Sequence, residues 1–116
     1  MHVLIVENDR YACAAAVAYL SILGYETASA SNGKEAISAA RREPPDLVIC
    51  DWQLGEGVDG CEVAKRLQRA YSSSVVMMSA HPMEQLKFAS ADIDVLSYMP
   101  KPLSLARLAA AINEAK

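Results

Sequence analysis

The sequence has no apolar run that approaches the roughly 20 residues needed by a membrane-spanning helix. Its first residues also lack the basic lead and the apolar length of a secretory signal peptide. With a net charge of −3, the chain has no excess of positive charge for binding a nucleic-acid backbone. These absences predict a cytoplasmic protein that contacts neither a membrane nor a nucleic acid.

Cysteine is scarce as well, with three residues and no pair in the CxxC spacing. This gives no support for a disulfide framework or a zinc site, and it fits a reducing compartment. Cys50 lies within an apolar run, so we expect it to be buried and to behave as a small apolar side chain. His2, at the start of the chain, is expected to be exposed and to have no role.

What the sequence does contain is a high apolar fraction, 53%, with 22% charged residues over 116 positions. These values fit one well-packed domain and argue against disorder. There is no internal repeat, low-complexity segment or linker. We therefore treat residues 1–116 as one domain.

Strand-like and helix-like patterns alternate five times along the chain. Apolar runs predict strands at 3–6, 47–50, 75–78 and 95–98, and a weak alternation predicts an edge strand at 25–30. Helical spacing, with capping and stop signals, predicts helices over 9–23, 32–43, 63–71, 82–89 and 104–112. This alternation predicts an α/β fold with a parallel sheet covered by helices on both faces, although periodicity alone leaves the strand order open.

Polar side chains follow four of the predicted strands at their carboxyl ends: Glu7-Asn8-Asp9, Asp51, Ser79 and Lys101. In a parallel sheet these ends share one edge, where ligands bind. A carboxylate at the end of a buried strand is costly unless something pairs with it or uses it. Crowded carboxylates need a cation, and hard oxygen ligands suit Mg²⁺. A carboxylate can also attack phosphorus, so the cluster points to phosphoryl transfer onto Asp51.

Four segments in this order and spacing are similar to those of one protein family. They are Val-Leu-Ile-Val-Glu at 3–7, Asp-Leu-Val-Ile-Cys-Asp at 46–51 with Asp-Gly at 59–60, Met-Met-Ser-Ala at 77–80, and Tyr-Met-Pro-Lys-Pro at 98–102. From residue 3 to about residue 112 the chain resembles a response regulator receiver domain, the phosphoryl-accepting part of two-component signalling. The resemblance implies a flavodoxin-like (βα)5 fold with strand order 2-1-3-4-5, and a phosphoacceptor module rather than an enzyme.

The resemblance also implies roles for individual residues. Asp51 would be the phosphoacceptor, Ser79 would bond a phosphoryl oxygen, and Ala80 would be small enough to leave access. Lys101 would pair with Asp51 and then with its phosphate, with the bond to the following proline in cis. Tyr98 matches the aromatic switch position, which turns inward as Ser79 moves toward the phosphoryl group.

For Mg²⁺ the resemblance implies four ligands: Glu7, Asn8, Asp51 and the backbone carbonyl of Gln53. Receiver domains usually carry an acid where this chain has Asn8, so we predict weaker Mg²⁺ binding, with Asp9 compensating through water. The loop after Asp51 also departs from the pattern, with Gly55 where proline is common and one extra residue before Asp59. Gln53 and His81 occupy the two positions that, in the family, tune how fast the phosphoryl group is lost.

The implied partners are a sensor histidine kinase or phosphotransfer protein and a downstream protein. The latter would bind the face formed by the fourth helix, fifth strand and fifth helix, which could also form a homodimer. We expect no attached DNA-binding or enzymatic output region, and therefore a stand-alone regulator or phosphoryl shuttle, or a receiver cut from a larger protein.

Two other interpretations stay open. Asn8 is compatible with a degenerate receiver that binds proteins without phosphorylation. A small phosphatase with an Asp51 nucleophile is disfavoured because Gln53 supplies no general acid.

The role of Trp52, next to Asp51, also stays open: its side chain could cover the site or face a partner.

Overall fold

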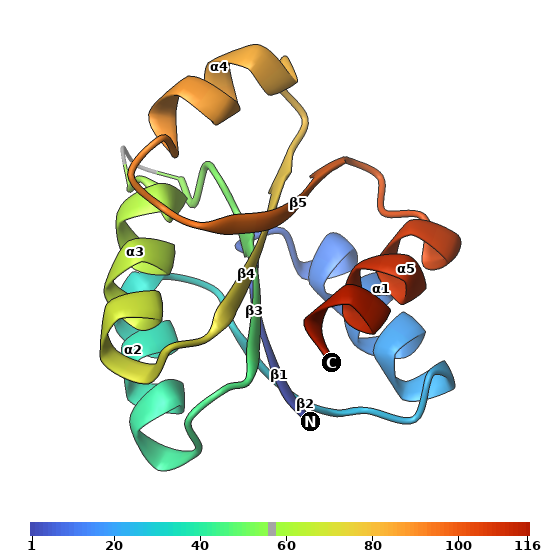
Figure 1. Cartoon of the computed structure of the whole chain (residues 1–116). Coiled ribbons are helices and arrows are strands. Elements are labelled where there is room, and N and C mark those ends of the chain that lie inside the picture. The colour runs from blue at the N-terminus through green and yellow to red at the C-terminus, as the bar shows by residue number, and fades with distance from the viewer. Residues whose placement is uncertain (56–57) are drawn as a thin grey trace.

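The computed structural model describes residues 1–55 and 58–116 (Figure 1). Within them strands and helices alternate: β1 (His2–Val6), α1 (Arg10–Ile22), β2 (Glu26–Ala30), α2 (Gly33–Arg42), β3 (Leu47–Asp51), α3 (Gly60–Tyr71), β4 (Ser74–Ser79), α4 (Met83–Ala89), β5 (Val95–Pro100) and α5 (Leu105–Ala115). Among the described residues, no helix is long and apolar enough to cross a bilayer.

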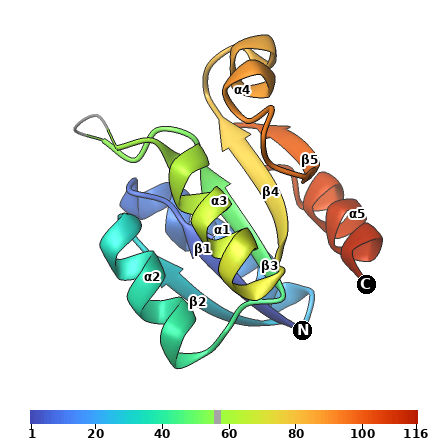
Figure 2. The same ribbon diagram turned by 60° about the vertical axis from the view of Figure 1, so that its left-hand side comes forward.

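The five strands form one parallel sheet in the order β2-β1-β3-β4-β5, which confirms the predicted fold class. Helices α2 and α3 cover one face of the sheet, and α1 and α5 cover the other (Figures 1 and 2). Side chains alternate along each strand, so Leu4 and Val6 enter the core beneath α2 and α3. Val3 and Ile5 enter the core beneath α1 and α5.

Helix ends follow the local chemistry of the sequence. Asn32 caps α2 by accepting the Glu35 N–H at 2.9 Å, although the Glu35 carboxylate accepts the backbone N–H of Ser31 instead of the backbone N–H of Asn32. Gly24 follows α1 with φ of +83°, the left-handed conformation that glycine adopts without strain.

Several predictions need correction, among them two helix ends: α3 begins at Gly60 instead of residue 63, and α5 ends at Ala115 instead of residue 112. His2 is buried, with 8% of its surface exposed, because it is the first residue of β1 and its backbone is held by Asp46: the His2 N–H donates to Asp46 Oδ2 at 2.7 Å. Strand β5 continues two residues beyond the predicted end, to Pro100. Proline is tolerated there because β5 is an edge strand, where one row of N–H groups has no partner strand.

Proline is excluded from position 55, where the loop after β3 has φ of +80°, because the proline ring fixes φ near −65°. The extra loop length expected before Asp59 includes residues 56 and 57, which lie outside the described residues.

Candidate functional site

Asp51 is the last residue of β3, between β1 and β4. It is only 6% exposed, so its carboxylate has lost most of its hydration. The start of α3 presses against its backbone: a Cβ added at Gly60 would lie 1.8 Å from the Asp51 carbonyl oxygen. Gly60, which sequence reasoning quoted without giving it a role, is therefore required sterically for this approach.

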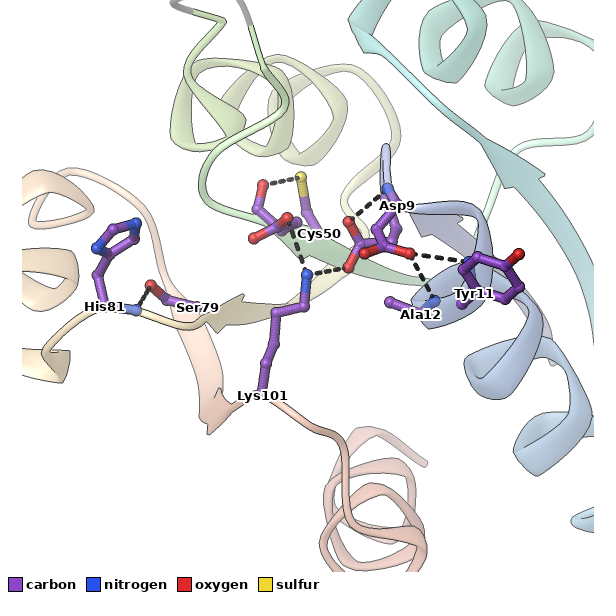
Figure 3. A network of polar contacts seen from close by, with 9 residues as sticks. Asp9, Tyr11, Ala12, Cys50, Ser79, His81 and Lys101 are labelled. Carbon is purple, nitrogen blue, oxygen red and sulfur yellow. Dashed lines mark hydrogen bonds and ion pairs between the residues drawn. The ribbon is translucent and has the colours of Figure 1, made fainter.

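Three of the expected site residues converge. Lys101, just beyond β5, directs its Nζ toward the ends of β1 and β3 (Figure 3). It lies 3.3 Å from Asp51 Oδ2 and forms an ion pair with Glu7 Oε1. Glu7 is 2% exposed, so two buried carboxylates share one ammonium group. The Lys101–Pro102 peptide bond is cis, as the family resemblance implied.

The electrostatics of this cluster follow from burial and charge. Burial raises the pKa of Asp51 from 3.8 to about 6, the hydrogen bond and charge of Glu7 add to the rise, and Lys101 opposes it. For Lys101, burial alone would lower the pKa, but the carboxylates of Glu7 and Asp51 outweigh it and the pKa is raised. With all three groups ionised, the cluster carries one net negative charge.

One carboxylate oxygen of the remaining acid at the end of β1, Asp9, caps a helix. Asp9 is the N-cap of α1 and accepts the N–H groups of Tyr11 and Ala12 at 2.8 and 3.2 Å (Figure 3). These bonds hold the pKa of Asp9 below its ordinary value. The Asp9 N–H in turn donates to Glu7 Oε2 at 3.1 Å, which orients the Glu7 carboxylate.

Ser79 ends β4 beside Asp51, since Met78 is the register partner of Asp51. Its buried hydroxyl accepts the N–H of His81 at 2.8 Å, which leaves the hydroxyl hydrogen available for donation (Figure 3). The His81 ring meets the ring of Trp52 edge to face, with centroids 6.3 Å apart. Trp52 is half-buried and therefore lies at the rim of this part of the site.

Tyr98 lies on β5, half-buried, with its hydroxyl 2.8 Å from Ser90 Oγ. Ser90 is fully buried at the end of α4 and bonds the Leu86 carbonyl at 2.8 Å, so the pair ties β5 to α4. The Lys87 ammonium lies 5.6 Å from the centre of the Tyr98 ring. Sequence reasoning missed Ser90, because a lone serine in a loop carries no signal of a partner eight residues away.

The two remaining expected Mg²⁺ ligands, Asn8 and Gln53, are exposed. No polar contact joins their side chains to Asp51 among the described residues. The side-chain amide of Asn8 lies beside the loop that follows β3, since a Cβ added at Gly55 would stand 3.0 Å from Asn8 Nδ2. The paired carboxylates of Glu7 and Asp51 leave a net negative charge, and an amide oxygen and a backbone carbonyl are hard donors of the same kind, so this donor set fits Mg²⁺.

The two cysteines near the site, Cys50 and Cys61, are buried, and their thiol pKa values are raised. Burial raises the pKa of the Cys50 thiol well above its ordinary value, and burial raises that of Cys61 to about 12. Cys50 is fully buried and directs its sulfur at the carbonyls of Asp51 and Gly60, each at 3.4 Å. This confirms the expected burial of Cys50.

Comparison with protein families gives a match over residues 3–113 to the model described as "Response regulator receiver domain". Transcriptional regulatory protein ZraR of Klebsiella oxytoca is 32% identical over 114 residues, covering 97% of this chain and 26% of that protein. Alkaline phosphatase synthesis transcriptional regulatory protein PhoP of Bacillus subtilis is 32% identical over 103 residues, covering 88% of this chain and 42% of PhoP. The chain thus spans less than half the length of these curated relatives.

Solved structures give the same result at the level of the fold. The signal receiver domain of a modulated diguanylate cyclase from Desulfovibrio desulfuricans G20 superposes with a TM-score of 0.90 at 29% identity, covering 98% of this chain and 91% of that one. The N-terminal domain of a response regulator/sensory box/GGDEF protein from Carboxydothermus hydrogenoformans gives a TM-score of 0.89 at 26% identity, covering 99% and 93%.

Proposed function

This chain belongs to the family of response regulator receiver domains, and from that premise we propose that it accepts a phosphoryl group on Asp51. The observation that carries the proposal is the buried carboxylate of Asp51 held 3.3 Å from the Lys101 ammonium, at the carboxyl edge of the sheet. A structural ion pair alone would not need a second buried carboxylate, Glu7, beside it.

In the proposed reaction a carboxylate oxygen of Asp51 forms a bond to phosphorus. The phosphorus–nitrogen bond of a phosphohistidine on the donor protein breaks, and the leaving imidazole takes a proton from solvent. The Lys101 ammonium and the Ser79 hydroxyl would then bond phosphoryl oxygens, with Ser79 exchanging its present bond to His81 for this one. Bound Mg²⁺, held by Glu7, Asn8, Asp51 and the Gln53 carbonyl, would neutralise charge on the phosphoryl oxygens and the carboxylates.

Phosphorylation of Asp51 would change the surface formed by α4, β5 and α5. Movement of Ser79 toward the phosphoryl group would open room for Tyr98, whose hydroxyl now bonds Ser90 at the end of α4. Breaking that bond would release α4 from β5 and change the surface offered to a downstream protein or a second copy. Couplings of about 1–3 kcal/mol are typical of such switches and suffice to redistribute two states.

Intact-mass spectrometry after incubation with acetyl phosphate and Mg²⁺ tests the proposal, with Asp51→Asn as the variant and Asp46→Asn as its control. Asp46 is an exposed aspartate directly before β3, at the end of the sheet where the strands begin, whereas Asp51 lies where they end. We expect one added phosphoryl group on the wild type and on Asp46→Asn, and none on Asp51→Asn. Equal labelling of all three proteins would refute the assignment.

A second candidate, the degenerate receiver, is favoured by one observation, the neutral Asn8 where the family usually has an acid. It predicts no added mass under any Mg²⁺ concentration while binding to a partner protein persists. Rapid release of inorganic phosphate without accumulation of modified protein would instead support the phosphatase.

A further inference from the structure

We propose that His2, Glu26 and Glu43 form a second metal site, selective for a divalent transition metal such as Zn²⁺, at the edge of the sheet opposite Asp51. One ligand atom from each of these side chains lies within 4.8 Å of the other two. Neither the receiver chemistry nor the family resemblance uses any of the three residues.

The fold brings these residues together from three elements. His2 and Glu26 are register partners at the starts of the adjacent parallel strands β1 and β2, so their side chains emerge side by side. Helix α2 ends on the side of the sheet where β1 begins (Figure 2). Its C-cap residue, Glu43, therefore lies beside His2 and Glu26. His2 Nδ1 lies 3.3 Å from Glu43 Oε2.

The burial of His2 is the observation that points to a ligand. Its side chain is 10% exposed, yet neither ring nitrogen has a hydrogen-bond partner among the described residues. Buried polar groups are normally satisfied, because an unpaired one costs about 1–3 kcal/mol. The nearby Glu43 oxygen is close enough to be an ion-pair partner without hydrogen-bond geometry. A metal ion bound between His2 Nδ1 and the two carboxylates would satisfy that ring nitrogen together with both acids.

The donor set selects the metal. Imidazole suits Zn²⁺, Cu²⁺ and Ni²⁺ better than Mg²⁺ or Ca²⁺, which prefer oxygen ligands alone. Zn²⁺ binds nitrogen and carboxylate oxygen at about 2.0–2.2 Å, so ligand atoms in a tetrahedral site stand about 3.4 Å apart. The His2–Glu43 distance already matches this edge. Glu26 and Glu43 are exposed, so their flexible side chains can close the remaining distance. Three protein ligands would leave a fourth position for water.

The local charge is mixed. The two carboxylates and the carbonyl end of α2 favour a cation. Arg41 and Arg42 in the last turn of α2 oppose it, but both are exposed and therefore screened by solvent. Occupancy would link β1, β2 and the α2–β3 connection, and would stabilise the folded chain in proportion to metal concentration.

Co²⁺, whose visible absorption reports its coordination, and Zn²⁺ as its competitor test the site in the untagged protein with Mg²⁺ in excess. We expect one tightly held Co²⁺ that Zn²⁺ displaces, and a melting temperature that rises with Zn²⁺. Glu26→Gln and Glu43→Gln remove exposed charges, so both variants should fold, and each should weaken Zn²⁺ binding by about tenfold or more.

Two controls keep this test separate from the phosphorylation site and from the thiols. Glu114→Gln, which removes an exposed glutamate on α5, and Asp51→Asn should both bind Zn²⁺ as the wild type does. Unchanged affinity in Glu26→Gln and Glu43→Gln would overturn the proposal. So would thiolate-to-cobalt absorption that disappears in Cys13→Ser, because it would place the metal on a cysteine.

Discussion

The raised pKa of Asp51 makes a quantitative prediction about the variant Asp51→Asn in the absence of divalent cations. The folded-state pKa, about 6, lies above the ordinary value of 3.8, so the folded protein holds the proton more tightly than the unfolded chain. Stability from this group is fully present below about pH 4 and is lost as pH rises through about 6. At about 1.4 kcal/mol per pKa unit, the loss amounts to about 3 kcal/mol.

The amide of Asp51→Asn does not titrate, so the variant escapes this loss. We expect the free energy of unfolding of the variant, relative to wild type, to rise by up to about 3 kcal/mol between about pH 4 and pH 7. Urea unfolding followed by circular dichroism in EDTA measures the difference at each pH. Adding Mg²⁺ should stabilise the wild type more than the variant, because only the wild type retains the second carboxylate.

For a matched control variant, Asp92→Asn, we expect the pH-dependent change in stability to have the opposite sign. Asp92 forms an exposed ion pair with Lys65, and its hydrogen bond to that lysine holds the pKa of Asp92 below the ordinary value. The free energy of unfolding of Asp92→Asn, relative to wild type, should therefore fall as pH rises through the acidic range. A constant difference between Asp51→Asn and wild type across the range, or a difference that follows the Asp92→Asn sign, would refute the burial argument.

Three further predictions concern the metal ligands, the switch residue and the close approach behind Asp51. Asn8→Asp should tighten Mg²⁺ binding about tenfold, measured by tryptophan fluorescence. Tenfold is about 1.4 kcal/mol, less than the roughly 2 kcal/mol by which a single negative charge attracts a dication at 4 Å in water, because salt screens the interaction. Tyr98→Phe removes the bond to Ser90 and should lower the free energy of unfolding by about 1 kcal/mol in urea titration. Gly60→Ala should lower the free energy of unfolding by about 3 kcal/mol in the same assay, the upper part of the overpacking range, because its Cβ would collide with the Asp51 carbonyl.

Each of the two stability predictions has a control variant within the chain. Tyr11 is 82% exposed, so Tyr11→Phe should change stability little. Gly33→Ala meets only the end of the Val63 side chain, at 3.0 Å, and should cost less than Gly60→Ala. Equal Mg²⁺ affinity with and without Asn8→Asp would count against Asn8 as a ligand. Equal losses within either stability pair would show that the named contact does not matter.

Much of this architecture could be predicted from the sequence, because it depends on local patterns. Four-residue apolar runs marked β1, β3 and β4, and an asparagine, Asn32, and a serine, Ser104, before helical patterns marked the caps of α2 and α5. The meeting of Glu7, Asp51 and Lys101 followed from parallel strands ending at one edge. The strand order came only from the family resemblance.

What could not be predicted depends on contacts between distant residues. The burial of His2 depends on a backbone bond to Asp46, 44 residues away. The Ser90–Tyr98 bond depends on how α4 packs against β5, which neither segment signals. Asp9 Oδ1 caps α1, a role that the preceding strand end concealed, and the expected compensation of Asn8 by Asp9 through water stays a prediction.

The position of the phosphoryl group is the most direct test of the central claim. Protein labelled with acetyl phosphate and Mg²⁺ is treated with borohydride, which reduces an acyl phosphate to an alcohol, and the peptides are then sequenced by mass spectrometry. The account predicts that Asp51 is the aspartate recovered as homoserine. Reduction at Asp9, Asp59 or any other carboxylate, with Asp51 intact, would contradict it.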